Sequence, residues 1–141
     1  MHCESADRNE LLDLRPVAAT RFGLKRRALD HLMWLIRHTR IMDWEPGNRV
    51  VVYKSVSDTA AERQVTARQI YNYEQDISDA FGLRVELSYN RRRYGRRDAE
   101  TGRIVTAFGF ELTELRRALP DLRQVRPDFR HIQTKQHRKC L

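Results

Sequence analysis

The sequence predicts an α+β fold that is mainly helical and carries a small antiparallel β-hairpin. Apolar residues recur at helical spacing along most of the chain before Gly82, whereas they alternate with polar residues after it. The length of 141 residues suits one compact domain with its own core. We therefore expect one folded domain over residues 22–120, a flexible leader at 1–21 and a basic, disordered tail at 121–141.

The first long helix is predicted within residues 22–40, because a broad apolar stripe runs through them at helical spacing. The stripe consists of Leu24, Ala28, Leu29, Leu32, Met33, Leu35 and Ile36. The stretch DWEPG at 43–47 then breaks the pattern, and the β-branched run from Val50 to Tyr53 predicts a single short strand.

Two helices joined by a tight turn are predicted next, which is typical of a helix-turn-helix. The stretch SVSDTAAERQ at 55–64 reads as a short helix capped by Ser55 or Ser57. In the following helix, Thr66 is a suitable N-cap, Gln69 completes a capping box and Gly82 ends the helix. Its predicted buried stripe is Ile70, Tyr73, Ile77, Ala80 and Phe81.

Strands are predicted beyond Gly82, with Leu83, Val85 and Leu87 on one face of the first. Gly102 in the stretch DAETG suits the left-handed position of a hairpin loop. Residues 91–97 and 103–110 should therefore pair antiparallel, with Ile104, Phe108 and Phe110 on one face. A final short helix is expected after its cap Thr113, with Leu115, Leu119 and Leu122 on its apolar side and Pro120 ending or kinking it.

This order of elements is that of a winged helix-turn-helix, in which the second helix of the pair enters the DNA major groove and the hairpin rests on the flanking backbone. The outward face of that helix displays polar side chains that suit base edges. They are Arg68, Gln69, Tyr71, Asn72 and Gln75, together with Thr66 at the helix start. A polar face is also normal for any exposed helix, and the capping box would occupy Gln69, so Arg68 and Asn72 rank above it.

The charge of the chain indicates a polyanionic partner. The chain has 27 Lys and Arg against 19 Asp and Glu, a net charge of +8, and five arginines crowd into the stretch NRRRYGRRD at 90–98. These residues, Arg91, Arg92, Arg93, Arg96 and Arg97, would repel one another unless phosphates of a DNA duplex neutralised them. The alternative is a solvated edge strand whose charges deter aggregation. Lys25 and Arg26 lie at the start of the first long helix. They either contact phosphates or belong to the solvent-exposed face of this helix.

Signals for an enzyme are poor, and we expect no cofactor, no metal and no small-molecule substrate. Asp43 and Glu45 are expected to cap or solvate a turn, and His31 and His38 to lie at the surface or at a helix end. His131, His137 and Cys140 lack a zinc-site spacing. Only two cysteines, no apolar run of membrane length and no signal peptide predict a cytoplasmic protein without a membrane partner.

Four stretches together resemble a known family: FGLKRRALDHLMWLI, DWEPGNRVVVYKSV, VTARQIYNYEQDISDAFG and RRYGRRDAETGRIVTAFGFELTEL. Over about residues 22–119 the chain is similar to the N-terminal region of replication protein C, the initiator of plasmids with a three-gene replication and partition operon. The resemblance implies a winged-helix domain that binds double-stranded DNA at the plasmid origin. It also implies a recognition helix over 66–81 and a wing over 91–103.

Two departures from the family bear on these expectations. Members often have glycine where this chain has Gln64, so either Gln64 adopts a left-handed conformation at a cost of about 1 kcal/mol or the turn is built differently. Members also normally continue into a second region. The chain is therefore expected to be a truncated relative that binds DNA, a regulator of the same sites or the remnant of an interrupted gene.

Two other functions fit the same residues. The alternatives are a winged-helix transcriptional regulator and a protein-interaction module without DNA affinity. The sequence leaves open whether the protein is a monomer or a dimer.

Overall fold

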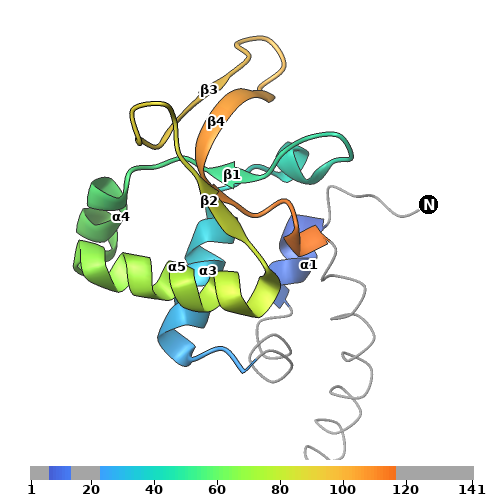
Figure 1. Cartoon of the computed structure of the whole chain (residues 1–141). Helices are drawn as coiled ribbons and strands as arrows, with labels where there is room; N and C mark the ends of the chain where they lie inside the picture. Colours follow the sequence, from blue (N-terminus) through green and yellow to red (C-terminus); the bar gives the residue numbers. More distant parts are fainter. Residues whose placement is uncertain (1–6, 14–22, 117–141) are drawn as a thin grey trace, which may run out of the picture.

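The computed structural model describes residues 7–13 and 23–116, which form helices packed on one side of a small antiparallel sheet (Figure 1). The β3–β4 hairpin projects away from the helices. The elements in chain order are α1 (Asp7–Asp13), α3 (Arg26–Arg37), the 3₁₀ helix η2 (Ile41–Trp44), β1 (Val51–Val52), α4 (Val56–Arg63), α5 (Ala67–Phe81), β2 (Arg84–Glu86), β3 (Tyr94–Arg97) and β4 (Ile104–Glu111). The predicted α+β class is confirmed, as is the predicted order of α-helices and strands from α3 onward; η2 was not predicted.

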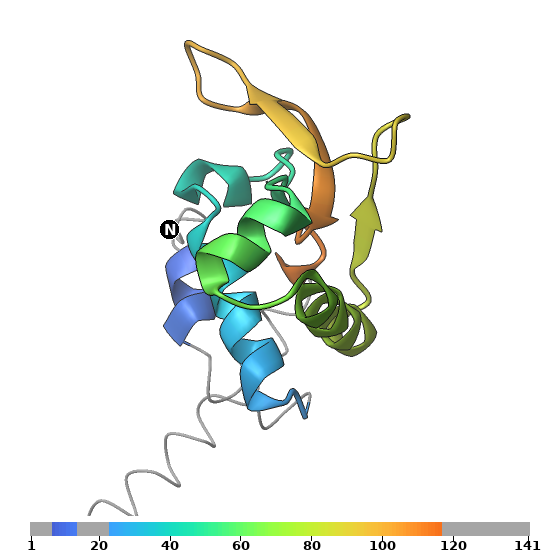
Figure 2. The same cartoon turned by 90° about the vertical axis from the view of Figure 1, so that its left-hand side faces the viewer.

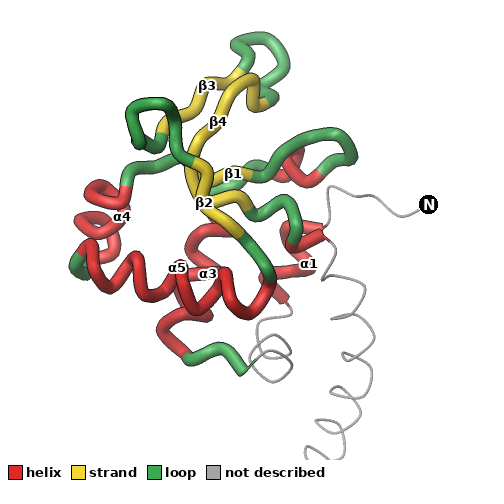
Figure 3. The backbone as a smooth tube through the Cα atoms, in the orientation of Figure 1, coloured by secondary structure: helices red, strands yellow, loops and turns green. Residues whose placement is uncertain are grey.

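Strand β4 is the centre of the sheet. Its end pairs with both β1 and β2, so that Phe110 lies opposite Val52 on one side and Val85 on the other. The earlier part of β4 pairs with β3, so the predicted hairpin is confirmed for residues 94–97 and is wrong for 91–93. Because Glu86 pairs with Gly109 and Tyr94 pairs with Phe108, residues 87–93 have no place in the ladder. They are extruded as a separate loop, which we call the arginine loop (Figure 3).

Local sequence signals account for the boundaries of α4 and α5. Ser55 caps α4, since its hydroxyl accepts a hydrogen bond from the backbone N–H of Asp58 at 3.0 Å. Gln64 ends α4 in the left-handed conformation, with φ of 59°, so the first of the two predicted turn geometries is confirmed. Gly82 ends α5 in the same conformation, with φ of 69°.

The main core lies between α3, the C-terminal end of α5 and the sheet. Trp44, Phe110 and Ile77 are fully buried there, and Leu115 packs beside them. A smaller cluster of Val56, Ala60 and Ile70 holds α4 against α5. The predicted strand face of Leu83, Val85 and Leu87 is only partly inside, because Leu83 is buried while Val85 and Leu87 are exposed.

Part of the predicted flexible leader is helical in the structure. Helix α1 buries Leu11 in the main core. The Arg8 guanidinium donates hydrogen bonds to the backbone oxygens of Arg37 and Thr39, each at 3.0 Å, where α3 ends. Cations suit this position because the last carbonyls of a helix lack partners. The predicted tail at 121–141, with Leu119, Pro120 and Leu122, lies outside the described residues.

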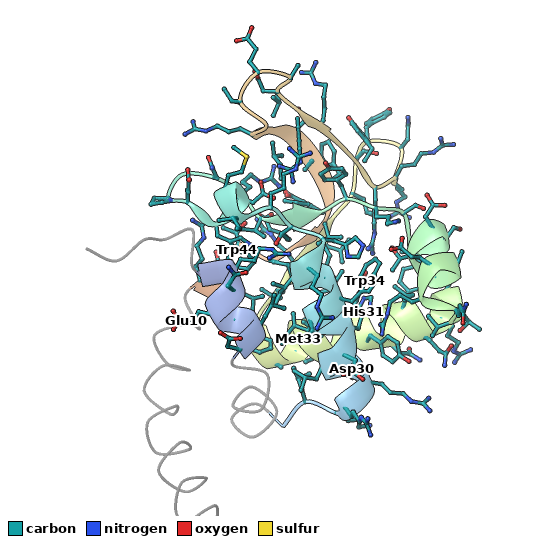
Figure 4. The ribbon with its side chains drawn as sticks, turned by 180° about the vertical axis from the view of Figure 1, so that it is seen from behind. Glu10, Asp30, His31, Met33, Trp34 and Trp44 are labelled. Carbon is teal, nitrogen blue, oxygen red and sulfur yellow. The ribbon has the colours of Figure 1, made fainter. Side chains whose placement is uncertain are left out.

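The expectation that His31 lies at the surface or at a helix end is wrong. His31 is fully buried on the inner side of α3, stacked on Trp34 with ring centroids 5.8 Å apart (Figure 4). Its Nδ1 accepts a hydrogen bond from the Arg63 guanidinium of α4 at 2.7 Å, and its ring contacts Tyr73 of α5. Burial, with the nearby Arg63 and Arg93 charges, lowers the pKa of His31 to about 3. A neutral imidazole therefore joins α3, α4 and α5.

Candidate nucleic-acid interface

The outward face of α5 carries four of the predicted contact residues in one patch. Arg68, Tyr71, Asn72 and Gln75 are all exposed, Tyr71 by 56 %. Arg68 and Gln75 each lie three or four positions from Tyr71 and Asn72, so these side chains are neighbours on the helix surface. The Gln75 amide donates to the Asp79 carboxylate at 2.9 Å, which fixes its direction along the helix.

Thr66 and Gln69 are engaged with each other at the start of α5. The Gln69 carbonyl oxygen accepts from the backbone N–H of Thr66 at 2.9 Å, and the Thr66 hydroxyl accepts from the backbone N–H of Gln69 at 3.1 Å. The predicted capping box is thereby confirmed. These two side chains stabilise the helix start, which places them below Arg68 and Asn72 as candidates for base contact.

A tight turn shapes the arginine loop. The Ser88 carbonyl accepts from the N–H of Arg91 at 2.8 Å, the Ser88 N–H donates to the Arg92 carbonyl at 3.1 Å, and the Ser88 hydroxyl accepts from the N–H of Arg92 at 3.1 Å. Arg91 holds a left-handed conformation, with φ of 58°, at the position where such turns favour glycine. The turn points Tyr89, Asn90, Arg91 and Arg92 into solvent.

Arg93 connects the arginine loop to α5. Its guanidinium donates two hydrogen bonds to the Glu74 carboxylate, at 2.6 and 2.8 Å. The side chains of Arg93 and Glu74 are only 8 % and 6 % exposed. Two parallel bonds of this kind fix the orientation of both groups, so the loop is held at a set position against the helix.

Arg97 is held in the same manner on the other side of the hairpin. Its guanidinium donates to both oxygens of the Asp43 carboxylate at 2.8 Å, and its Nε donates to the Tyr53 hydroxyl at 3.1 Å. The hydrogen bonds that Arg97 donates to Asp43 raise the pKa of Arg97 above its ordinary value. Asp43 is buried and caps η2 as well, by accepting from the N–H of Arg40. It is therefore a structural partner and no solvated turn residue.

The five crowded arginines thus divide into two groups. Carboxylates of the protein neutralise Arg93 and Arg97, whereas Arg91, Arg92 and Arg96 are exposed. Self-repulsion among all five, the premise of the sequence argument, is correspondingly weaker. The Arg93–Glu74 pair could have been predicted from one sequence signal. Glu74 lies on the buried stripe of α5 between Ile70 and Ile77, where an unpaired carboxylate would require a cation.

A groove of about 550 Å³ separates α5 from the arginine loop. Tyr71 and Gln75 line it from the helix, and Arg91 and Arg92 line it from the loop. Figures 1 and 2 both place the loop above α5. The remaining lining residues are Ser55, Val56, Ser57, Glu74, Ser78, Val85, Leu87 and Arg93. The structure therefore brings two free arginines of the loop together with Tyr71 and Gln75 of the exposed α5 face around one groove, which Arg68 and Asn72 of the same face do not line.

The tip of the β3–β4 hairpin points elsewhere, as Figure 2 shows. It carries two exposed carboxylates, Asp98 and Glu100. Backbone N–H groups of Thr101 and Glu100 donate to Asp98 and hold the pKa of its carboxyl below the usual value. Arg96 is exposed on β3 but does not line the groove. The tip is less suited to phosphate than the arginine loop, because its carboxylates repel phosphate charge.

Lys25 and Arg26 lie at the start of α3, at the opposite end of the molecule from the hairpin (Figure 1). Lys25 lines a smaller hollow of about 290 Å³ together with Asp76 and Asp79 of α5. These carboxylates make that end of α5 acidic, whereas the arginine loop is basic. The structure does not bring Lys25 and Arg26 together with the other candidates.

Two kinds of feature are missing from the described ranges. Within 7–13 and 23–116, no helix has both the length and the apolar content needed to span a bilayer. In the same residues, no three His, Cys, Asp or Glu side chains are grouped so that they would hold a metal ion. His131, His137 and Cys140 lie outside these residues.

The comparison with protein families reaches further along the chain than the resemblance of residues 22–119. A family model described as Replication protein C N-terminal domain matches residues 1–140, and so takes in the segments predicted as leader and tail. No curated protein and no solved structure matches the chain. A match over nearly every residue shows the family. The chain belongs to the replication protein C family and corresponds to its N-terminal domain.

Proposed function

We propose that this chain binds double-stranded DNA at a plasmid origin with sequence preference, through the exposed face of α5 and the arginine loop. Membership of the replication protein C family implies a plasmid replication initiator domain, which is the setting for the proposal. The proposed role is binding without catalysis, in the cytoplasm. The observation that carries it is the shared groove, lined by Tyr71 and Gln75 on one side and by Arg91 and Arg92 on the other.

The exposed α5 face and the arginine loop suit different parts of a duplex. Arg68 and Asn72 can each form paired hydrogen bonds to base edges, and a contact of this type discriminates between bases by about 1–3 kcal/mol. Arg91 and Arg92 are cations on a fixed turn, and they suit phosphates of the flanking backbone. The Arg93–Glu74 pair supports this division of roles, because it sets the distance between the two sides before DNA arrives.

A salt titration with a plasmid origin duplex tests the proposal. The logarithm of the binding constant should fall linearly with the logarithm of salt concentration, because cationic side chains displace counterions from phosphates. The double variant Arg91→Ala/Arg92→Ala should weaken binding to every sequence and reduce the slope by about 2. The variant Arg68→Ala/Asn72→Ala should instead reduce the preference for origin DNA over a scrambled duplex.

The matched control is Arg26→Ala/Arg27→Ala, which removes the same charge from the start of α3. We expect it to change the slope much less. An equal effect of both double variants would mean that only net charge matters, and the proposed interface would then be wrong. Absence of affinity for any duplex at moderate salt would favour a protein-interaction module, whereas preference for promoter over origin DNA would favour a transcriptional regulator.

A further inference from the structure

Tyr89, at the tip of the arginine loop, has no role in the fold. Its side chain is fully exposed. Among the large apolar and aromatic side chains of the described residues, the next most exposed are Tyr71 at 56 % and Val105 at 52 %. Single exposed apolar residues are common on protein surfaces and by themselves indicate nothing. The position and surroundings of Tyr89 are what distinguish it.

Two sets of contacts fix the backbone that carries Tyr89. Tyr89 and Asn90 are the central residues of the turn that closes through the hydrogen bonds of Ser88 to Arg91 and Arg92. The end of the same loop is attached to α5 by the buried Arg93–Glu74 pair. An aromatic side chain on a fixed backbone has little conformational freedom to lose when it binds, because only two side-chain torsions remain.

The charges around Tyr89 indicate the chemistry of a ligand that its ring could contact. Arg91 and Arg92 follow it on the same turn and are exposed, and the Glu74 carboxylate, which lines the same groove as these arginines, is occupied by Arg93. A ligand that satisfies both features carries anionic groups beside flat aromatic groups. Nucleic acid has this combination, because each base lies within reach of its own phosphates.

We propose that Tyr89 stacks its ring on a nucleobase of the bound DNA, at a step that is partly unstacked when the arginine loop holds the adjacent phosphates. This inference rests on the proposed function, and it adds a contact that phosphate binding alone does not require. Aromatic side chains stack on any base because every base has a π-face, so the contact contributes affinity without a strong sequence preference. An inserted side chain also bends or opens the duplex locally.

The test uses a plasmid origin duplex that carries the fluorescent base 2-aminopurine at successive positions, one per duplex. Unstacking raises its emission. With the wild-type protein we expect increased emission at one step near the arginine loop, and Tyr89→Ala should abolish that increase while Tyr89→Phe retains it. Tyr89→Ala should also weaken binding between about 5-fold and 150-fold, the range of one base–aromatic stack, with the salt slope unchanged.

Tyr94→Ala is the matched control, because Tyr94 is another exposed tyrosine of the basic segment but packs on Phe108 with ring centroids 5.3 Å apart. It should retain the emission increase. Equal losses for Tyr89→Phe and Tyr89→Ala would overturn the stacking and assign the contact to the hydroxyl. Wild-type emission and affinity in Tyr89→Ala would overturn it as well.

A second arm separates this inference from the proposed function. The same variants are titrated against a single strand of the origin sequence, which offers bases without unpairing. If the wild-type protein binds no duplex, the proposed function fails, and Tyr89-dependent binding of the single strand would still support stacking. If the protein binds the duplex with the expected salt slope and Tyr89→Ala changes neither substrate, only the stacking fails. If it binds neither form of DNA, both fail.

Discussion

Arg93 and Glu74 form a buried ion pair between the arginine loop and α5, with two hydrogen bonds of 2.6 and 2.8 Å. Their positions in the chain differ by 19, and no other ion pair recorded in the described residues joins this loop to this helix. The pair decides where the free arginines of the loop stand relative to the exposed face of α5. It also has a measurable consequence for stability.

Removing one partner of this pair should destabilise the protein strongly. Glu74→Leu leaves the Arg93 charge buried without its counterion, and Arg93→Met does the same to the Glu74 charge, which typically costs about 3–5 kcal/mol in each case. The double variant Glu74→Leu/Arg93→Met should cost less than the sum of the single changes, because no unpaired charge remains. Urea denaturation of the two single variants and the double variant measures the coupling. Additive losses would show that the pair does not act as a unit.

Stability should decrease below pH 6.5 because of His31. The unfolded histidine takes up a proton near pH 6.5, whereas burial lowers the pKa of the folded histidine to about 3, so protonation favours the unfolded state. The free energy of unfolding should fall by about 1.4 kcal/mol per pH unit between pH 6 and pH 4.5 from this group. His31→Asn, whose amide oxygen can accept the Arg63 hydrogen bond, should lose that slope. If chemical denaturation at several pH values gave the same pH dependence of the unfolding free energy for His31→Asn as for the wild type, the prediction would be wrong.

Gln64→Gly should stabilise the fold. Gln64 ends α4 in the left-handed conformation, which costs a residue with a side chain about 1 kcal/mol or more. Glycine adopts it without strain but loses more backbone entropy on folding, so we expect a net gain of about 0.5 kcal/mol. Gln64→Ala is the control, because alanine keeps the strain. A higher melting temperature for alanine than for glycine would mean that the strain is relieved in some other way.

Arg91→Gly should separate stability from DNA binding. Arg91 holds the left-handed position of the loop turn, with φ of 58°, so glycine should keep or raise the melting temperature. The same change removes a cation from the groove and should weaken binding to every duplex. Arg91→Ala should weaken binding equally, while lacking the gain in stability. Wild-type affinity in Arg91→Gly would show that this charge is not used.

The sequence by itself determined the elements whose signals act over a few residues. The caps Ser55 and Thr66 with Gln69, the stop at Gly82 and the hairpin between β3 and β4 all follow from turn chemistry and hydrophobic period. Helix α1 could not be predicted, because a short polar segment is not stably helical by itself and depends on the packing of Leu11 in the main core. The burial of His31 was missed for the same reason, since its partners come from two other helices.

Only the tertiary structure decided which arginines are free. The carboxylates that neutralise Arg93 and Arg97 lie 19 and 54 positions away in the chain, on α5 and η2. No local rule connects residues so far apart, because such pairs form only after strands and helices have packed. The extrusion of residues 87–93 has the same origin. It follows from β2 and β3 pairing with neighbouring parts of β4, and it places Arg91 and Arg92 across a groove from α5.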